Sequence, residues 1–456
     1  MNDTPVAGGP RRLPYLWLVL GVGTIAAIAQ FGGPELLARL ADIEDAPTAP
    51  VLAGIVLIAL CSFVSFYATH GTPIPSFVAA IAFGIAGHEL FAPIVGNRTL
   101  LAALVTGSAA LILFGGGLEM PLRNFFRLLV KIALLAGPGV LLTGIALSFA
   151  IATAAQALGF AIPIAVVILL GGILASTDPA AIIPVLQHVR FKRRDTKDIV
   201  VAESALNDVV GTLVTSAFLK LGLAGMTIVA AYRSLAGEET WRFLGTQAAF
   251  GILFGLAGFA LLWVLSHIKR RHHETYGADQ VYFVAAPLLA FVGAAAFGGS
   301  GFLAAFLAGL LFHVHEHLRA VEHFFNQVID GVAKPVIFLL LGALVNVQAL
   351  IAYAPLGIAV ALVFMFAIRP AMVFIMLGLY SLFPNSPRGL KGSELVFISF
   401  VRETGAIPAV LLVTAVSQMT TPTNGLVEVG MWVILLTLVL APPFTPLVAR
   451  KTGVAD

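Results

Sequence analysis

Long apolar stretches recur along the whole chain, and they constrain its fold more than any other feature. About 20 apolar residues are needed to cross the hydrocarbon layer of a bilayer, and fourteen segments are long and apolar enough to do so. In lipid, every backbone polar group must be satisfied within the chain, which favours helices for this pattern. We therefore expect an all-α polytopic membrane protein with 13–14 transmembrane helices. The expected spans are 13–31, 51–69, 74–92, 99–119, 128–157, 161–188, 198–220, 242–268, 279–298, 301–316, 332–348, 350–382, 393–415 and 425–449.

The composition agrees with a membrane protein and excludes several other classes. The chain is 59% hydrophobic and 11% charged, whereas soluble domains carry about 25% charged residues. The longest polar gap, around 232–241, is too short for a soluble domain. The net charge of +3 follows from the loops and is no evidence for nucleic-acid binding. A single cysteine, Cys61, excludes an intrachain disulfide and a Cys-rich metal site.

The basic residues predict how the chain crosses the membrane. Lys and Arg collect in cytoplasmic loops, and a path that starts with Arg11 and Arg12 inside puts every basic connection on that side. We expect an inner (plasma) membrane location with a cytoplasmic C-terminus. The expected divisions are an extra N-terminal helix and periplasmic loop (1–50), a transmembrane unit (51–449) and a short cytoplasmic tail (450–456). The first segment also resembles a signal peptide, whose cleavage before Gln30 would leave thirteen spans.

Two of the expected spans are interrupted by proline and polar residues. One breaks at Thr177-Asp178-Pro179, and the other at Arg402-Glu403-Thr404, just before Gly405 and Pro408. Two such segments, one in each half of the chain, indicate inverted repeats with two broken helices that cross at a transport site. Asp178 and Glu403 can offset the positive ends of the half-helices. The alternative is a pair of ordinary proline kinks without function.

Three carboxylates lie where a bilayer tolerates few charges: Asp178, Glu203 and Asp208. A charge at membrane depth costs roughly 3 kcal/mol or more, and it persists mainly beside a partner or a watery path. Asp208 and Ser204 are four residues apart and share one helix face, and Glu203 and Asn207 share the neighbouring face.

The first of these faces offers oxygen atoms to a small hard cation, as does the broken segment at Thr177. Burial disfavours a charged carboxylate, so Asp208 could hold either a proton or a metal ion, but not both. The alternative is a structural role in hydrogen bonding between helices.

A deep positive charge, Arg369, needs a partner within its apolar segment, and Glu203 is the candidate. Otherwise Arg369 reaches an interface by snorkelling. Arg402 and Glu403 either neutralise each other or contribute to the site. The glycine run Gly115-Gly116-Gly117 is read as close helix packing, because no strand precedes it and no Lys follows.

Taken together, the motifs resemble the monovalent cation:proton antiporters, specifically the branch of NhaP-type and animal sodium/proton exchangers. The resemblance rests on Thr177-Asp178-Pro179 and on Glu203-Ser204-x-x-Asn207-Asp208, and it covers about residues 51–449. It implies a homodimer in which each protomer has a dimerisation domain and a mobile core, with elevator-like alternating access. Asp208 would bind cation and proton, Ser204 and Thr177 would supply oxygens, and Asp178 would balance the helix ends.

The same resemblance implies that Asn207, Glu203 and Arg369 form a supporting network. An Asn directly before the essential Asp is typical of the branch regarded as electroneutral. The chain departs from the family at Gly115 and Gly116, where many relatives carry an acid, and at Arg402-Glu403-Thr404, where Gly-Leu-Arg is common. These departures leave the choice of cation and the stoichiometry open.

The expected function is therefore proton exchange for sodium, or alternatively potassium or lithium, without enzymatic activity or an organic cofactor. A cation channel and a membrane sensor that does not transport are the alternatives. A histidine cluster from His313 to His323 lies on an expected cytoplasmic turn. It is read as a solvated loop, with pH sensing or metal binding as alternatives.

Overall fold

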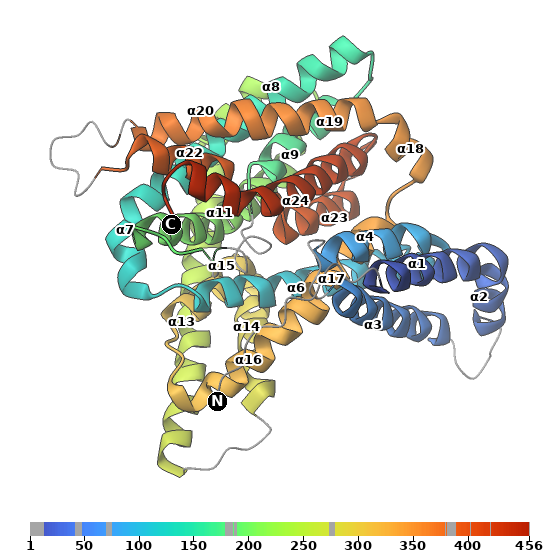
Figure 1. Ribbon diagram of the computed structural model, residues 1–456, viewed down its shortest axis with the longest axis horizontal. Helices are drawn as coiled ribbons and strands as arrows, with labels where there is room; N and C mark the ends of the chain where they lie inside the picture. Colours follow the sequence, from blue (N-terminus) through green and yellow to red (C-terminus); the bar gives the residue numbers. More distant parts are fainter. Residues whose placement is uncertain are drawn as a thin grey trace.

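Figure 1 shows the computed structural model, in which the described parts of the chain consist of helices joined by turns and short non-helical segments. The described residues are 13–41, 48–69, 75–177, 186, 189–272, 279–378, 380, 389–401, 403–419 and 421–455. Within these ranges, the pairing of extended backbone is limited to one isolated bridge, between Phe191 and Ala455. The expected all-α class is confirmed.

The first half of the chain contains α1 to α11. The helices are α1 (Leu13–Phe31), α2 (Gly33–Ala41), α3 (Ala49–Thr69), α4 (Ser76–Ala86), α5 (His88–Val95), α6 (Arg98–Leu118), α7 (Leu122–Leu134), α8 (Val140–Leu158), α9 (Ile164–Leu174) and α11 (Arg194–Leu221).

The second half contains α12 to α24. The helices are α12 (Ile228–Ser234), α13 (Glu238–His272), α14 (Asp279–Ala296), α15 (Gly301–Leu311), α16 (Arg319–Val328), α17 (Lys334–Ala343), α18 (Val347–Ala352), α19 (Ala354–Val363), α20 (Arg369–Val373), α22 (Gly392–Phe400), α23 (Ala406–Gln418) and α24 (Leu426–Lys451).

Each of the fourteen expected spans overlaps at least one of these helices, although the helices differ in length. Among the described residues, eight helical stretches are long and apolar enough to cross a membrane, and one bent pair reaches that length when taken together. Five shorter apolar helices, in α1, α9, α14, α15 and α23, match the remaining expected spans. The chain is thus a multi-pass membrane protein.

One expected span is not straight. The segment predicted at 74–92 consists of α4 and α5, whose axes differ by 90°. Gly87 both ends α4 and begins α5. A Cβ atom at Gly87 would lie 2.7 Å from the ring of Phe91 and 3.0 Å from Ile25, so the corner is packed too tightly for a side chain. Hydropathy predicts burial but not the direction of the helix axis, and it could not reveal this bend.

Both expected helix breaks begin where polar residues interrupt the apolar run. The helix α9 ends at Leu174, three residues before Thr177, and the chain is not helical at Ser176 and Thr177. The second break separates α22 from α23, between Phe400 and Ala406. The second broken helix therefore agrees with the prediction, as does the end of the first half of the first one; the predicted break residues Asp178 and Pro179 lie outside the described residues.

The site helix α11 lies among the elements that carry these breaks. It packs against α7, α9 and α23, and α9 also contacts α23 and α24. At one end of the molecule, α1 to α5 form a group that contacts α17 through α3, α4 and α5, while α13, α14 and α15 form a separate group beside α6 (Figure 1). The remaining helices, which include α9, α11 and α23, carry the residues of the candidate site.

The contact between α6 and α15 shows what the glycine run does. A Cβ atom at Gly117 would lie 2.5 Å from the carbonyl oxygen of Phe306 and 2.6 Å from the amide nitrogen of Leu310. The two backbones can approach this closely only because position 117 has no side chain. The close packing predicted for Gly115–Gly117 is therefore present at Gly117.

Candidate functional site

Four polar side chains project from the middle of α11 into the protein interior. Glu203, Ser204, Asn207 and Asp208 are each at most 3% exposed. Their spacing of one and four residues puts them on two adjacent faces of the helix, as the sequence predicts. Such a concentration of buried polar groups has to be balanced by partners on neighbouring elements.

The unwound end of α9 supplies several of those partners. The Ser204 hydroxyl donates a hydrogen bond to the backbone carbonyl oxygen of Thr177. The Asn207 side-chain amide donates to the Thr177 hydroxyl at 3.3 Å. Thr177 is fully buried, and its backbone carbonyl can face α11 because the helix has already ended. The structure thus brings three of the predicted site residues together.

Asp208 has a partner that the sequence reasoning missed. The Ser176 hydroxyl donates a hydrogen bond to Asp208 Oδ1 at 2.7 Å, and Ser176 is fully buried. Ser176 lies against Gly211, where a Cβ atom would be 2.6 Å from the Ser176 Cβ atom. Gly211 is three residues after Asp208, on the same face of α11. A glycine at that spacing was the available sequence signal for a close contact.

A second network surrounds Glu203. Its Oε2 atom lies 3.3 Å from Arg369 Nη2, and its Oε1 atom accepts a hydrogen bond from the Asn207 amide at 3.3 Å. The charged side chains of Arg369 and Glu203 are only 4% and 1% exposed. The pair predicted from the sequence is therefore in contact and buried, and Asn207 joins it to Thr177.

Arg369 owes its position to an irregular helix. It directly follows a π-helical turn, Phe364–Ile368, and precedes Pro370. Proline has no backbone N–H, and its ring clashes with the carbonyl group four residues earlier. A wider turn relieves that clash and turns the following side chain, and such turns are frequent at functional sites.

The second break contributes buried polar groups as well. Glu403 and Thr404 are both fully buried. The Thr404 backbone amide donates to the hydroxyl of Thr437 on α24 at 3.1 Å, and that hydroxyl donates to Val433 at 2.9 Å. Two further predicted site residues, Asp178 and Arg402, lie outside the described residues.

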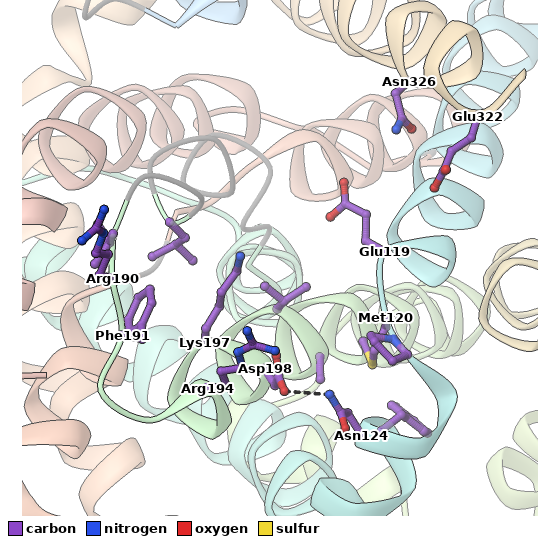
Figure 2. Close-up of a pocket in the computed structure, with 16 residues that line it drawn as sticks. Glu119, Met120, Asn124, Arg190, Phe191, Arg194, Lys197, Asp198, Glu322 and Asn326 are labelled. Carbon is purple, nitrogen blue, oxygen red and sulfur yellow. Dashed lines mark hydrogen bonds between the residues drawn. The ribbon is translucent and has the colours of Figure 1, made fainter. Parts of the chain in front are cut away.

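A cavity of about 780 Å³ opens beside the first half of α11 (Figure 2). Basic side chains from α11 and the preceding segment, such as Arg190 and Lys197, line one part of it. In Figure 2, Glu119 and Glu322 face it from the other side. The α11 part of the lining includes Ala202, which is the residue before Glu203. The lining thus follows α11 as far as Ala202, and the buried side chains from Glu203 onward are not part of it.

The same end of the molecule holds a polar junction that sequence reasoning did not identify. Glu394, which is 4% exposed, accepts hydrogen bonds from Arg193 at 2.9 Å and from Thr196 at 3.1 Å. It also accepts one from the Lys391 backbone amide at 2.7 Å, at the start of α22. The junction joins the beginning of the site helix to the first half of the second broken helix.

The histidine cluster lies apart from this site. The rings of His313 and His315 stand edge to face, 5.4 Å between centroids, and His323 lies 3.4 Å from the Gln327 amide. Among the residues that the structure describes, no three His, Cys, Asp or Glu side chains are close enough together to hold a metal ion. Glu322, beside His323, belongs instead to the lining of the cavity.

Comparison of the chain with solved structures identifies its fold. The structure of a sodium proton antiporter from Methanocaldococcus jannaschii at pH 8 superposes with a TM-score of 0.59 at 22% sequence identity. The alignment covers 96% of this chain and 99% of that chain. The arrangement of broken and crossing helices is thus that of a known antiporter fold.

Several curated proteins are similar in sequence. The K⁺/H⁺ antiporter NhaP of Alkalimonas amylolytica is 30% identical over 369 residues, which are 78% of this chain and 59% of that protein. The K⁺/H⁺ antiporter NhaP2 of Shewanella oneidensis is 28% identical, over 75% of this chain and 56% of its own length. The Na⁺/H⁺ antiporter 1 of Methanocaldococcus jannaschii is 29% identical, over 62% and 68% of the two chains.

The chain therefore spans 56–59% of the length of the first two of these relatives. A family model describing the transmembrane region of sodium/hydrogen exchangers matches residues 55–451, which include every element of the site described above. The chain belongs to the sodium/hydrogen exchanger family.

Proposed function

We propose that this protein is a secondary active antiporter that exchanges protons for a monovalent cation. The observation that carries the proposal is the environment of Asp208, a buried carboxylate on a membrane-spanning helix, bonded to Ser176 at the unwound end of α9. The family supports this function, as do relatives named as K⁺/H⁺ and Na⁺/H⁺ antiporters.

The exchange follows from the electrostatics of a buried acid. An isolated carboxylate charge at membrane depth is costly, and either a bound proton or a bound cation removes that cost. Because both use the same oxygen atoms, binding of one displaces the other. Ser204 and Thr177 supply further oxygens for a hard cation. The only covalent bond that changes is the O–H bond of Asp208, which forms when a proton binds and breaks when it leaves, so the proposed exchange includes neither an enzymatic step nor an organic cofactor.

The stoichiometry follows from which charge remains exchangeable. The Glu203 charge is offset by Arg369 inside the network, whereas Asp208 accepts a hydrogen bond from the neutral hydroxyl of Ser176, and we take Asp208 as the carboxylate that exchanges its partner. One carboxylate supports one proton against one monovalent cation, which makes the exchange electroneutral. If an imposed membrane potential changes the initial rate of exchange, this stoichiometry is wrong.

The transport cycle is proposed to be an elevator-like alternating access within a homodimer. The mobile core would contain the two broken helices and α11, and the remaining helices of residues 51–449 would provide the dimerisation domain. The C-terminus would lie in the cytoplasm, with the chain in the inner membrane. The cavity beside α11 would then be the cytoplasmic approach to Asp208.

The transported cation is proposed to be sodium, potassium or lithium. Relatives named for potassium and for sodium are similarly distant from this chain, so they favour neither ion. Exchange in proteoliposomes with each alkali cation, across a pH series, identifies the substrate. A pulse of the transported cation should dissipate an imposed proton gradient.

The variant Asp208→Asn tests the site. It keeps the size of the side chain and one oxygen that can accept the hydrogen bond from Ser176, but it cannot exchange a proton for a cation, so the response to the pulse should vanish. The matched control is Asp195→Asn, which removes a partly exposed acid in the first turn of the same helix, paired with Arg127. Activity retained in Asp208→Asn would rule out the assignment.

The same proteoliposomes distinguish an antiporter from a cation channel and from a sensor that does not transport. A channel would give cation conductance without obligatory proton movement. A sensor would bind the cation and leave the proton gradient intact.

A further inference from the structure

The hydroxyl of Ser176 makes an unusual hydrogen bond for a buried serine in this protein. Buried hydroxyl groups elsewhere, such as those of Ser65, Ser399 and Thr445, donate to the carbonyl oxygen four residues earlier in their own helix. That local bond satisfies the donor without any partner from another element. Ser176 instead donates to Asp208, 32 positions away in the sequence.

The two contacts between the unwound end of α9 and α11 are reciprocal. Ser176 donates to the carboxylate of Asp208, and Ser204, one helical turn earlier on α11, donates to the carbonyl oxygen of Thr177. Two successive residues of the break thus each contact one member of a pair spaced by four residues on the helix. This arrangement holds the Ser176 oxygen beside the carboxylate.

The Ser176 oxygen retains ligand capacity in this arrangement. A serine hydroxyl has one hydrogen to donate and two lone pairs. The hydrogen points to Asp208 Oδ1 at 2.7 Å, and the lone pairs remain for a cation that binds the same carboxylate. Hard cations take hydroxyl and carboxylate oxygens, and the size and ligand number of the cavity decide between ions of the same charge.

We propose that Ser176 is a specificity-determining residue of the exchanger, which supplies an oxygen ligand to the cation held by Asp208. The proposal rests on the antiport function argued above. Coulomb attraction grows as the distance between ion and oxygen shrinks, so the loss of one oxygen weakens the binding of a small ion more than that of a large one. Ser176 therefore favours lithium and sodium relative to potassium.

Gly211 shows that the position of Ser176 leaves little freedom. The Ser176 oxygen would lie 3.1 Å from a Cβ atom at position 211, and the Ser176 Cβ atom 2.6 Å from it. The absence of a side chain at 211 lets the break approach α11 closely enough for Ser176 to reach Asp208. A rigid position of this kind is what selection by ion size requires.

The test compares two substitutions at one position. Ser176→Ala removes the oxygen and some volume, and Ser176→Cys adds some volume and replaces the oxygen by sulfur, which hard cations avoid, so an effect that both variants share does not come from the change in volume. Each variant and the wild type are reconstituted in liposomes, and the apparent KM and the maximal rate of exchange are measured for Li⁺, Na⁺ and K⁺. Both variants should raise the KM for Li⁺ and Na⁺ about tenfold, and the KM for K⁺ by a smaller factor.

The matched control is Thr212→Val. Thr212 is buried on the same helix, four residues after Asp208, but its hydroxyl donates to the Val209 carbonyl oxygen of that helix at 2.7 Å. This variant should leave the ratios of the three KM values unchanged. A structural role of Ser176 would scale all three cations alike, so a change in the ratios separates selectivity from folding.

Each outcome decides the proposal. If Ser176→Ala and Ser176→Cys shift the KM ratios toward potassium while Thr212→Val does not, Ser176 is a ligand that selects by size. If the ratios stay at their wild-type values, the proposal is overturned while the antiport function stands. If the wild type itself exchanges no alkali cation for protons, the proposed function fails, and the role of Ser176 fails with it.

Discussion

Replacement of Arg369 by Met should destabilise the protein strongly, because it leaves a buried negative charge without its counterion. Arg369 and Glu203 are 4% and 1% exposed and lie 3.3 Å apart. After the change, Glu203 keeps the hydrogen bond from Asn207 but loses its positive partner. Removing one member of a buried pair costs about 3–5 kcal/mol, because the remaining charge stays desolvated.

The measurement is a double-mutant cycle on the purified protein in detergent, with the free energy of unfolding followed by denaturant titration. Arg369→Met and Glu203→Gln should each be destabilised. The combined variant carries neither charge of this pair and should recover most of the loss. The expected coupling free energy is about 2–3 kcal/mol, which a simple sum of the two single changes does not allow.

A surface ion pair provides the control, and the distance between its charged atoms is shorter than that in the buried pair. Arg127 lies 2.7 Å from Asp195, but the two side chains are 53% and 22% exposed. Such pairs contribute about 0–1 kcal/mol, and added salt screens them. Two results would contradict this reasoning. Arg369→Met could be as stable as Arg127→Met, or the combined variant could be as unstable as Arg369→Met alone. Either result would mean that burial does not determine how much these ion pairs contribute to stability.

Two further predictions concern packing. Gly211→Ala should weaken exchange and lower the stability, because the new Cβ atom would lie 2.6 Å from the Cβ atom of Ser176. Gly116→Ala should be tolerated, because the atom nearest to its Cβ atom would lie 3.8 Å away. Equal effects of the two variants on thermal unfolding and transport would contradict this. Phe191→Cys combined with Ala455→Cys should form a disulfide on mild oxidation. Phe191 and Ala455 pair in an antiparallel bridge, and the hydrogen bond runs between the neighbouring residues Lys192 and Val454. In such a pair the two Cα atoms lie about 4.5 Å apart, which is within the range of a disulfide. Mass spectrometry before and after reduction detects the bond, and its absence would show that these backbone segments are not paired.

The membrane-spanning pattern was predictable from sequence because burial in lipid requires apolar residues at nearly every position. That requirement identified the fourteen segments, and the proline and polar residues inside two of them identified the breaks. It did not give the directions or ends of the helices. The 90° corner at Gly87 and the end of α9 at Leu174 depend on contacts with other helices. The helix that begins at Arg319 was also placed too late, at 332, because its first turns are amphipathic rather than wholly apolar.

The charged residues of the candidate site could be predicted from the sequence, whereas its neutral polar residue Ser176 could not. A carboxylate or an arginine at membrane depth needs an explanation, so Glu203, Asp208 and Arg369 were identifiable from sequence alone. A serine in an apolar segment needs none, because it can bond to its own helix. Ser176 was therefore missed, although it makes the shorter contact, 2.7 Å to Asp208 compared with 3.3 Å between Arg369 and Glu203.

The position at which α9 ends determines which polar groups the neighbouring helix α11 can contact. In a continuous helix the carbonyl oxygen of Thr177 would accept a hydrogen bond from its own chain, and Ser176 would have a carbonyl group within reach four residues earlier. Because α9 ends at Leu174, both groups turn toward α11 instead. The termination of one helix thus supplies the polar partners that a neighbouring helix needs in order to keep a carboxylate buried. A substitution that extends α9 through residue 177 would remove those partners without touching Asp208 and should abolish exchange as completely as the loss of the carboxylate itself.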